Sequence, residues 1–189
     1  MNYMKQLIAF LMMAFLGFSG TVSAQTEAPR KVLVIYYSWG GNTRHVVSEI
    51  EKLIAADRYE IELVNPYPTE YNACGEQAKK DLDNQARPAI KGKLPDMKQY
   101  DTILIGYPIW CGMFPMVIPS LLEKVDLKGK RVIPFCTHGG GGSYNSFTEL
   151  RKHCVGATFG KGLSIHGKGG SSLHASLRQW LSDNTLINK

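Results

Sequence analysis

An apolar run of strand length leads directly into a short polar turn whose residue types suit the binding of an anion. Residues 32–37 are β-branched, aliphatic or aromatic without a polar break, which is typical of a strand buried on both faces of a parallel sheet. Two adjacent glycines then let the backbone turn tightly and approach a ligand, and hydroxyl and amide side chains lie beside the free amides that open the next helix. The predicted phosphate site consists of Ser38, Trp39, Gly40, Gly41, Asn42 and Thr43.

This turn differs from the two most common phosphate-binding loops. No Gly-Lys-Ser/Thr follows it, as in a P-loop, and it lacks the three-glycine spacing of a dinucleotide site. A smaller phosphate ligand therefore fits it better. The alternative is a tight turn between a strand and a helix that binds no ligand, because such junctions also occur for structural reasons alone.

The turn Ser38-Trp39-Gly40-Gly41-Asn42-Thr43 resembles the phosphate loop of the flavodoxin family, which reads Ser/Thr-x-Thr-Gly-x-Thr. The resemblance implies FMN as the cofactor. Gly40 stands where the family usually has threonine, so one hydroxyl donor is missing.

Strands and helices alternate along the single domain, residues 31–189, that must position this turn. Strands are expected at 32–37, 59–64, 101–107, 131–136 and 158–165. A first helix is expected to open directly at the turn, with its apolar face over 46–54, and further helices at 69–84, 115–124, 146–154 and 171–181. This alternation predicts an α/β fold with a parallel sheet, right-handed crossovers and helices on both faces. The resemblance implies the flavodoxin-like three-layer sandwich, with five parallel strands in the order 2-1-3-4-5.

The loop after the third strand is aromatic and apolar, so it is expected to be covered rather than exposed to water. Ligands of such sheets bind beyond the carboxyl ends of the strands, here between strands one and three. Trp110 could stack on a flavin ring, for about 0.5 to 1.5 kcal/mol beyond burial, or simply pack on a neighbouring helix. The loop is similar to the Trp-Trp-Gly loop of a bacterial flavodoxin-like subfamily, in which Gly112 would turn its peptide toward the flavin N5. The candidate cofactor residues here are Pro108, Ile109, Trp110, Cys111, Gly112 and Met113.

The loop after the fourth strand contains four successive glycines, residues 139–142. Ordering so many glycines is entropically unfavourable, so we expect backbone to pass close to a ligand there. The subfamily reads Pro-Phe-Cys-Thr-His at this place, as residues 134–138 do, and main-chain amides of flavodoxins bind the pyrimidine edge of the flavin. Zinc is the alternative ligand for the histidine, but no second histidine or cysteine lies at ligand spacing. The candidate cofactor residues are Thr137, His138 and Gly139.

The first 24 residues have the pattern of a secretory signal peptide. Lys5 precedes an apolar run, residues 7–18, and small residues then lead to a predicted cleavage site after Ala24. The run is shorter than the ~20 residues that span a bilayer, so an uncleaved anchor is the less favoured alternative. We therefore expect a periplasmic or secreted protein with a short tail, residues 25–30, and with no stable membrane span after cleavage.

The charge balance of the chain is mildly basic. The formal charge of +6 becomes +5 when Lys5 is removed with the signal peptide. There is no run of five to eight Lys or Arg residues, so nucleic-acid binding is not expected, whereas an anionic cofactor or an acidic partner is compatible with this charge.

These observations favour an exported FMN protein that carries electrons to or from an unidentified redox partner protein. Two alternatives stay open: an FMN-dependent reductase of quinones or similar small acceptors, and a flavodoxin-fold protein that has lost FMN. If the chain is an enzyme, we expect an FMN-dependent oxidoreductase, because no hydrolytic arrangement of residues is legible.

Cysteines in an exported chain encounter an oxidising compartment, where they can pair. Cys74 follows the second strand and Cys111 the third, so both are expected at the carboxyl edge of the sheet, and a disulfide between them is predicted. Free thiols are the alternative for this pair, and the expectation for Cys136 and Cys154.

Overall fold

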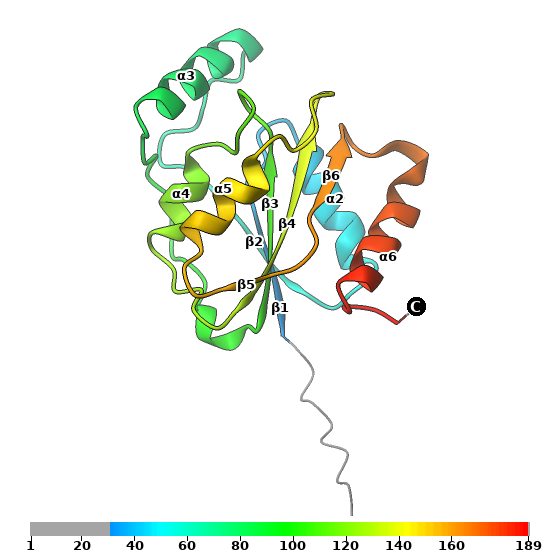
Figure 1. Cartoon of the computed structure of the whole chain (residues 1–189). Coiled ribbons are helices and arrows are strands. Elements are labelled where there is room, and N and C mark those ends of the chain that lie inside the picture. The colour runs from blue at the N-terminus through cyan, green and yellow to red at the C-terminus, as the bar shows by residue number, and fades with distance from the viewer. Residues whose placement is uncertain (1–30, 189) are drawn as a thin grey trace, which may run out of the picture.

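A parallel sheet forms the centre of the molecule (Figure 1). The computed structural model describes residues 31–188; the predicted signal peptide and tail lie outside the described residues. The strand order is β2-β1-β3-β4-β5, with β6 also pairing with β4, so the predicted order is confirmed. The strands are β1 (Val32–Tyr36), β2 (Asp57–Glu60), β3 (Thr102–Pro108), β4 (Arg131–His138), β5 (Thr158–Phe159) and β6 (Leu163–His166).

Helices cover both faces of the sheet, which gives the predicted three layers. Figure 1 shows α2 (Asn42–Glu51) and α6 (Leu173–Asp183) on one face, and α4 (Val117–Leu122) and α5 (Ser146–His153) on the other. The remaining helix, α3 (Tyr71–Asp83), lies farther from the sheet, toward the edge at which the strand arrows end (Figure 1). Two short 3-10 turns, η1 (Met97–Gln99) and η2 (Gly170–Ser172), precede β3 and α6.

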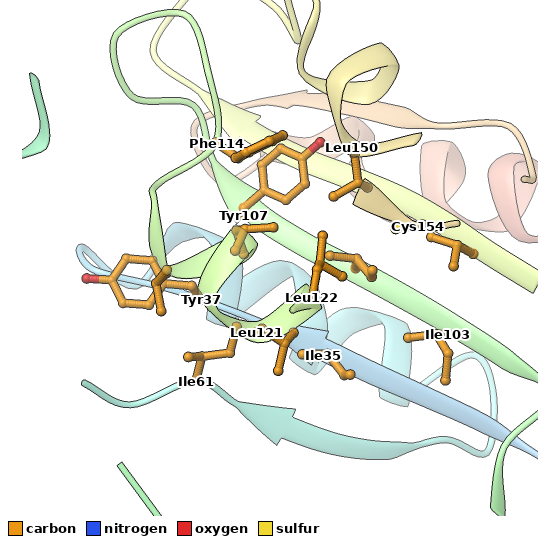
Figure 2. Packing of buried hydrophobic residues seen from close by; sticks show 14 of the residues in the cluster. Ile35, Tyr37, Ile61, Ile103, Tyr107, Phe114, Leu121, Leu122, Leu150 and Cys154 are labelled. Atoms are coloured by element: carbon orange, nitrogen blue, oxygen red, sulfur yellow. The ribbon is translucent and has the colours of Figure 1, made fainter. Parts of the chain in front are cut away.

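The strand pattern explains the two cores. Successive side chains of a strand point to opposite faces, and β1 is apolar throughout, so it supplies both cores. Leu33 and Ile35 join the core beneath α4 and α5, where Figure 2 shows residues of the two helices and the strands packed together. Val32 and Val34 join the core beneath α2 and α6. Packing against helices on both faces therefore fixes the position of β1 and of the turn that follows it.

The predicted fifth strand, 158–165, is two short strands. Both β5 and β6 pair with β4, and residues 160–162 lie between them. Gly160 still donates its amide to Val132 O of β4 at 2.9 Å, whereas Lys161 bonds the end of α6. The amide of Lys161 donates to Asn184 Oδ1 at 2.9 Å, and its carbonyl accepts from Trp180 Nε1 at 2.6 Å. A β-carbon on Gly160 would lie 2.4 Å from Asn184 Oδ1, so glycine permits this close approach. Hydrogen bonds to the end of α6 therefore replace strand pairing at Lys161.

The second strand was also placed too late in the sequence. It ends at Glu60 rather than at residue 64. Ile61 still donates its amide to Tyr36 O of β1 at 2.7 Å, but the residues after it pair with a different segment: Val64 N donates to Ala89 O at 2.8 Å, and Leu63 forms an antiparallel bridge with Ile90. The apolar alternation continued past the end of the strand, but the pairing partner changed.

Candidate functional site

The turn after β1 gives α2 an open N-terminus. Gly41, the residue before the helix, adopts a left-handed conformation with φ of 85°, which glycine reaches without strain, and it has no side chain to cap the helix. The Ser38 hydroxyl oxygen accepts from the amide of Arg44 at 3.2 Å, so it caps the third residue of the helix. Within residues 31–188, the amides of Asn42 and Thr43 have no recorded protein acceptor. Such amides at a helix N-terminus suit an anion.

The only positively charged side chain in the first turn of α2 is neutralised within the fold. Arg44 Nε donates to Glu60 Oε2 at 2.9 Å, and Tyr36 donates to the same carboxylate at 2.8 Å. Hydrogen bonding to Glu60 raises the pKa of the Arg44 guanidinium. An anion at this turn would therefore be held mainly by amides and hydroxyls, as the absence of a lysine indicated.

A buried hydrogen bond joins the turn after β1 to the end of β4. The hydroxyl oxygens of Thr43 and Thr137 lie 2.9 Å apart, and both residues are buried. One of the two hydroxyls donates this bond, so the proton of the other is left for a second acceptor. The amide of Ile109 donates to the Thr137 carbonyl at 2.8 Å. The first turn of α2, the loop after β3 and the end of β4 thus meet at Thr137.

The loop after β3 forms a tight two-residue turn. Trp110 and Met113 exchange backbone hydrogen bonds of 2.8 and 2.9 Å, and Cys111 and Gly112 between them have φ of 51° and 78°. Positive φ at both central residues defines a type I′ turn. Glycine suits this conformation and cysteine does not, so the turn is strained at Cys111.

The Trp110 side chain packs edge-on against three other rings. Its ring centroid lies 5.0 Å from Tyr67, 5.7 Å from Tyr37 and 6.2 Å from Trp39, with interplanar angles of 80° to 89°. Tyr67 donates to the buried carboxylate of Asp81 in α3 at 2.6 Å. The indole is half-buried. Trp110 therefore packs on aromatic rings of loops rather than on a neighbouring helix, and its stacking on a ligand stays a prediction.

Trp39 faces this aromatic cluster rather than the start of α2. Its indole nitrogen donates to the Pro68 carbonyl at 2.9 Å, and its ring lies 6.4 Å from that of Tyr71. The Trp39 side chain therefore lies between the phosphate turn and α3, whereas the main chain of the turn lies at the edge of the sheet.

His138 orders the glycine-rich loop. Its Nδ1 atom accepts hydrogen bonds from the amides of Gly140 and Gly142 at 3.0 and 3.1 Å. Only a neutral imidazole can accept in this way, and burial together with the neighbouring His166 lowers the pKa of His138. A β-carbon on Gly139 would meet no atom within 4 Å, so this residue borders open space.

Sequence reasoning did not select Tyr144, although its loop was identified. The ring of Tyr144 lies 3.9 Å from the position of a β-carbon on Gly112, and its hydroxyl lies against Gly141. It thus bridges the loops after β3 and β4 while remaining 62% exposed. An aromatic residue two positions after the glycine run was the available signal.

The predicted disulfide between Cys74 and Cys111 is wrong for this structure, in which all four cysteines are free. Cys74 is buried in the core on the inner side of α3, whereas Cys111 is exposed at the tip of its turn. Both border the same cavity of about 410 Å³. Open space, rather than direct contact, separates the two segments.

Two further findings concern the described residues only. No group of three or more histidine, cysteine or acidic side chains there is arranged to hold a metal ion. No helix within residues 31–188 is long and apolar enough to cross a membrane.

The sequence profile of the flavodoxin family matches residues 31–184, which include all three candidate loops. The chain belongs to the flavodoxin family. None of the curated proteins matches it. The relation to the family thus rests on the profile, on the strand order and on solved structures.

Two solved structures from Bacteroides resemble this flavodoxin-family protein, and both are named as candidate flavoproteins. The one from Bacteroides eggerthii is 32% identical, with a TM-score of 0.72, over 84% of this chain and 99% of the other. The one from Bacteroides uniformis is 30% identical, with a TM-score of 0.73, over 82% and 99%. A flavoprotein in complex with FMN from Lactobacillus acidophilus is 21% identical, with a TM-score of 0.66, over 80% and 98%, and shows the shared fold.

Proposed function

We propose that this protein binds FMN at the carboxyl edge of its sheet and carries electrons between redox partners outside the cytoplasm. The observation that supports this most strongly is that Thr137 joins the three segments there: its hydroxyl bonds that of Thr43 and its carbonyl accepts from Ile109, beside two amides at the N-terminus of α2 that are free within residues 31–188. Membership of the flavodoxin family and the likeness to a solved FMN complex support the same cofactor.

The residues present fit the three chemical parts of FMN. The amides of Asn42 and Thr43 and the spare threonine proton suit the phosphate. Gly40 and Gly139 each have open space where a side chain would otherwise lie, so backbone is accessible at both loops. Trp110 and Tyr144 are partly or largely exposed aromatic rings that can contact a flat ring system.

Bound FMN would supply the electron chemistry, and the chain would supply binding and shielding. The candidate loops contribute backbone amides, hydroxyls and aromatic rings. Of the cysteines near these loops, Cys74 and Cys136 are buried, and Cys111 forms part of the turn after β3. This composition favours a carrier over a hydrolytic or group-transfer enzyme.

Export is part of the proposal and rests on the signal-peptide pattern of residues 1–24. Because a Sec-type signal carries an unfolded chain, FMN would bind after translocation. Fractionation of expressing cells, with N-terminal sequencing of the product, tests this. We expect a periplasmic or secreted protein that begins at Gln25, and an uncleaved product bound to the membrane would contradict it.

The carrier function is tested with FMN-loaded protein and a chemical reductant. We expect the flavin spectrum to bleach on reduction and to return once an oxidant is added, with no steady oxidation of NADH or NADPH in the presence of a quinone. Sustained turnover of either nicotinamide would instead support the FMN-dependent reductase.

A further inference from the structure

A cavity of about 410 Å³ lies between α3 and the loop after β3. Trp39, Tyr71 and Trp110 provide aromatic walls, and Ile109 adds an apolar surface. This size is within the range of small-molecule sites, and such sites are mostly apolar with a few polar groups. The cavity shares residues 109–111 with the candidate flavin loop, so a molecule bound there would lie beside the place proposed for the cofactor.

One face of α3 leaves this cavity open. Tyr71, Cys74, Gly75 and Ala78 follow the spacing of a single helix face and all line the cavity. Three of these four residues are small, so their side chains leave the space beside this face of the helix unfilled.

Gly75 has no conformational reason to be glycine. It lies inside α3 and does not have a positive φ, and glycine weakens a helix interior more than any residue except proline. A β-carbon there would meet no atom within 4 Å, so close packing does not exclude a side chain either. What the glycine does provide is open volume in the cavity.

The chemistry of the walls points to a flat, uncharged ligand. Glu76 is the only charged residue among the described residues that line the cavity, and its carboxylate disfavours an aromatic anion. The Asn72 amide at the rim can donate a hydrogen bond to a carbonyl oxygen. A quinone combines a flat apolar ring, carbonyl acceptors and the ability to exchange electrons with a flavin.

We propose that this cavity is a binding site for a small quinone, which adjoins the flavin site and shares Trp39 and residues 109–111 with the candidate cofactor residues. The identity of the ligand as a redox partner rests on the proposed function, but its binding does not require the flavin to be present.

Binding is tested with dimethylnaphthoquinone, in which both free carbons of the quinone ring are methylated so that the exposed Cys111 thiol cannot add to it. Tryptophan fluorescence of the mature protein follows its binding, because two tryptophans line the cavity, and calorimetry gives an independent Kd. The same measurements are made for FMN. The variant Gly75→Leu fills the cavity, and Gly75→Ala is the matched control because it adds only a β-carbon.

For Gly75→Leu we expect the Kd for the quinone to rise by at least about tenfold, because the leucine side chain occupies space that the ligand needs. Its Kd for FMN should stay within about twofold of the wild-type value. Gly75→Ala should bind both ligands nearly as the wild type does. Leucine and alanine are strong helix formers, so neither variant should have a lower melting temperature than the wild type. If Gly75→Leu does melt at a lower temperature, Gly75→Met is a second variant that fills the cavity.

Unchanged quinone binding by Gly75→Leu, or no quinone binding by the wild type, would overturn the proposal. Equal weakening of FMN and quinone would also overturn it, because the cavity would then belong to the flavin site. Quinone binding that is lost in Gly75→Leu, in a protein that does not bind FMN at all, would support the quinone site and contradict the proposed function.

Discussion

Thr43 is the residue at which the phosphate turn and the end of β4 meet, since its buried hydroxyl bonds that of Thr137. If the spare proton of this pair serves the phosphate, Thr43→Ala removes a charge-assisted hydrogen bond that only FMN can accept. We expect FMN affinity to fall by roughly 1.5 to 3 kcal/mol, and riboflavin affinity to fall much less. Parallel titrations of both ligands measure the difference.

Thr43→Ser is the matched control, because it keeps the hydroxyl and removes only the methyl group. It should retain most of the FMN affinity. Equal weakening of FMN and riboflavin by Thr43→Ala would show that the residue acts through Thr137 on the ring site, and that the phosphate lies elsewhere.

His138 makes the glycine-rich loop sensitive to pH. Its pKa in the folded protein lies below the unfolded value of about 6.5, so the unfolded chain takes up the proton first. The stabilisation is therefore complete above pH ~6.5 and is lost as pH falls through the lower folded pKa. Urea denaturation between pH 8 and 5 should show this loss in the wild type.

The variant His138→Asn keeps an acceptor oxygen but does not titrate. Its stability should decline less over the same pH range, while His166 and the other histidines remain in both proteins. Identical pH profiles would mean that protonation of His138 does not control the loop.

At the scale of elements, the sequence predicted what continuous patterns determine. The unbroken apolar run of β1 and the one-face spacing of α2 correctly placed the turn between them. Local pattern could not show that residues 62–64 pair with residues 89–91 instead of β1, or that Lys161 bonds the end of α6, because both depend on contacts distant in sequence. The edge-on packing of Trp110 against Tyr37 and Tyr67 could not be predicted from the sequence for the same reason.

Gly106 in β3 is required by the packing of the neighbouring strand. A β-carbon there would lie 2.1 Å from the ring of Phe135, which is fully buried in β4. Gly106→Ala should therefore lower the free energy of unfolding by about 1 to 3 kcal/mol, the usual effect of overpacking a core. Denaturant unfolding measures it.

Adding Phe135→Leu to Gly106→Ala removes the ring with which the new β-carbon clashes. The double variant should be more stable than the sum of the two single losses predicts, because the two residues are in contact. Strict additivity would show that the ring is not what the alanine meets.

At the scale of the whole molecule, the formal charge is +6, and it becomes +5 if the proposed signal peptide is removed together with Lys5. Reduction of a bound flavin to its anion adds negative charge, which a basic protein opposes less. We expect a less negative potential for that couple than in acidic relatives. Added salt should reduce the difference, since charges farther than ~10 Å are screened at 0.1 M. Equally low potentials at low ionic strength would contradict the charge argument.

The central claim is that the three loops at the carboxyl edge of the sheet bind FMN, and a fluorescence titration of FMN with the mature protein tests it most directly. At micromolar protein, we expect the flavin emission to be quenched with saturation at one FMN per chain, because aromatic rings border the site. Emission that stays equal to that of free FMN throughout the titration would contradict the account and would favour a flavodoxin fold that has lost its cofactor.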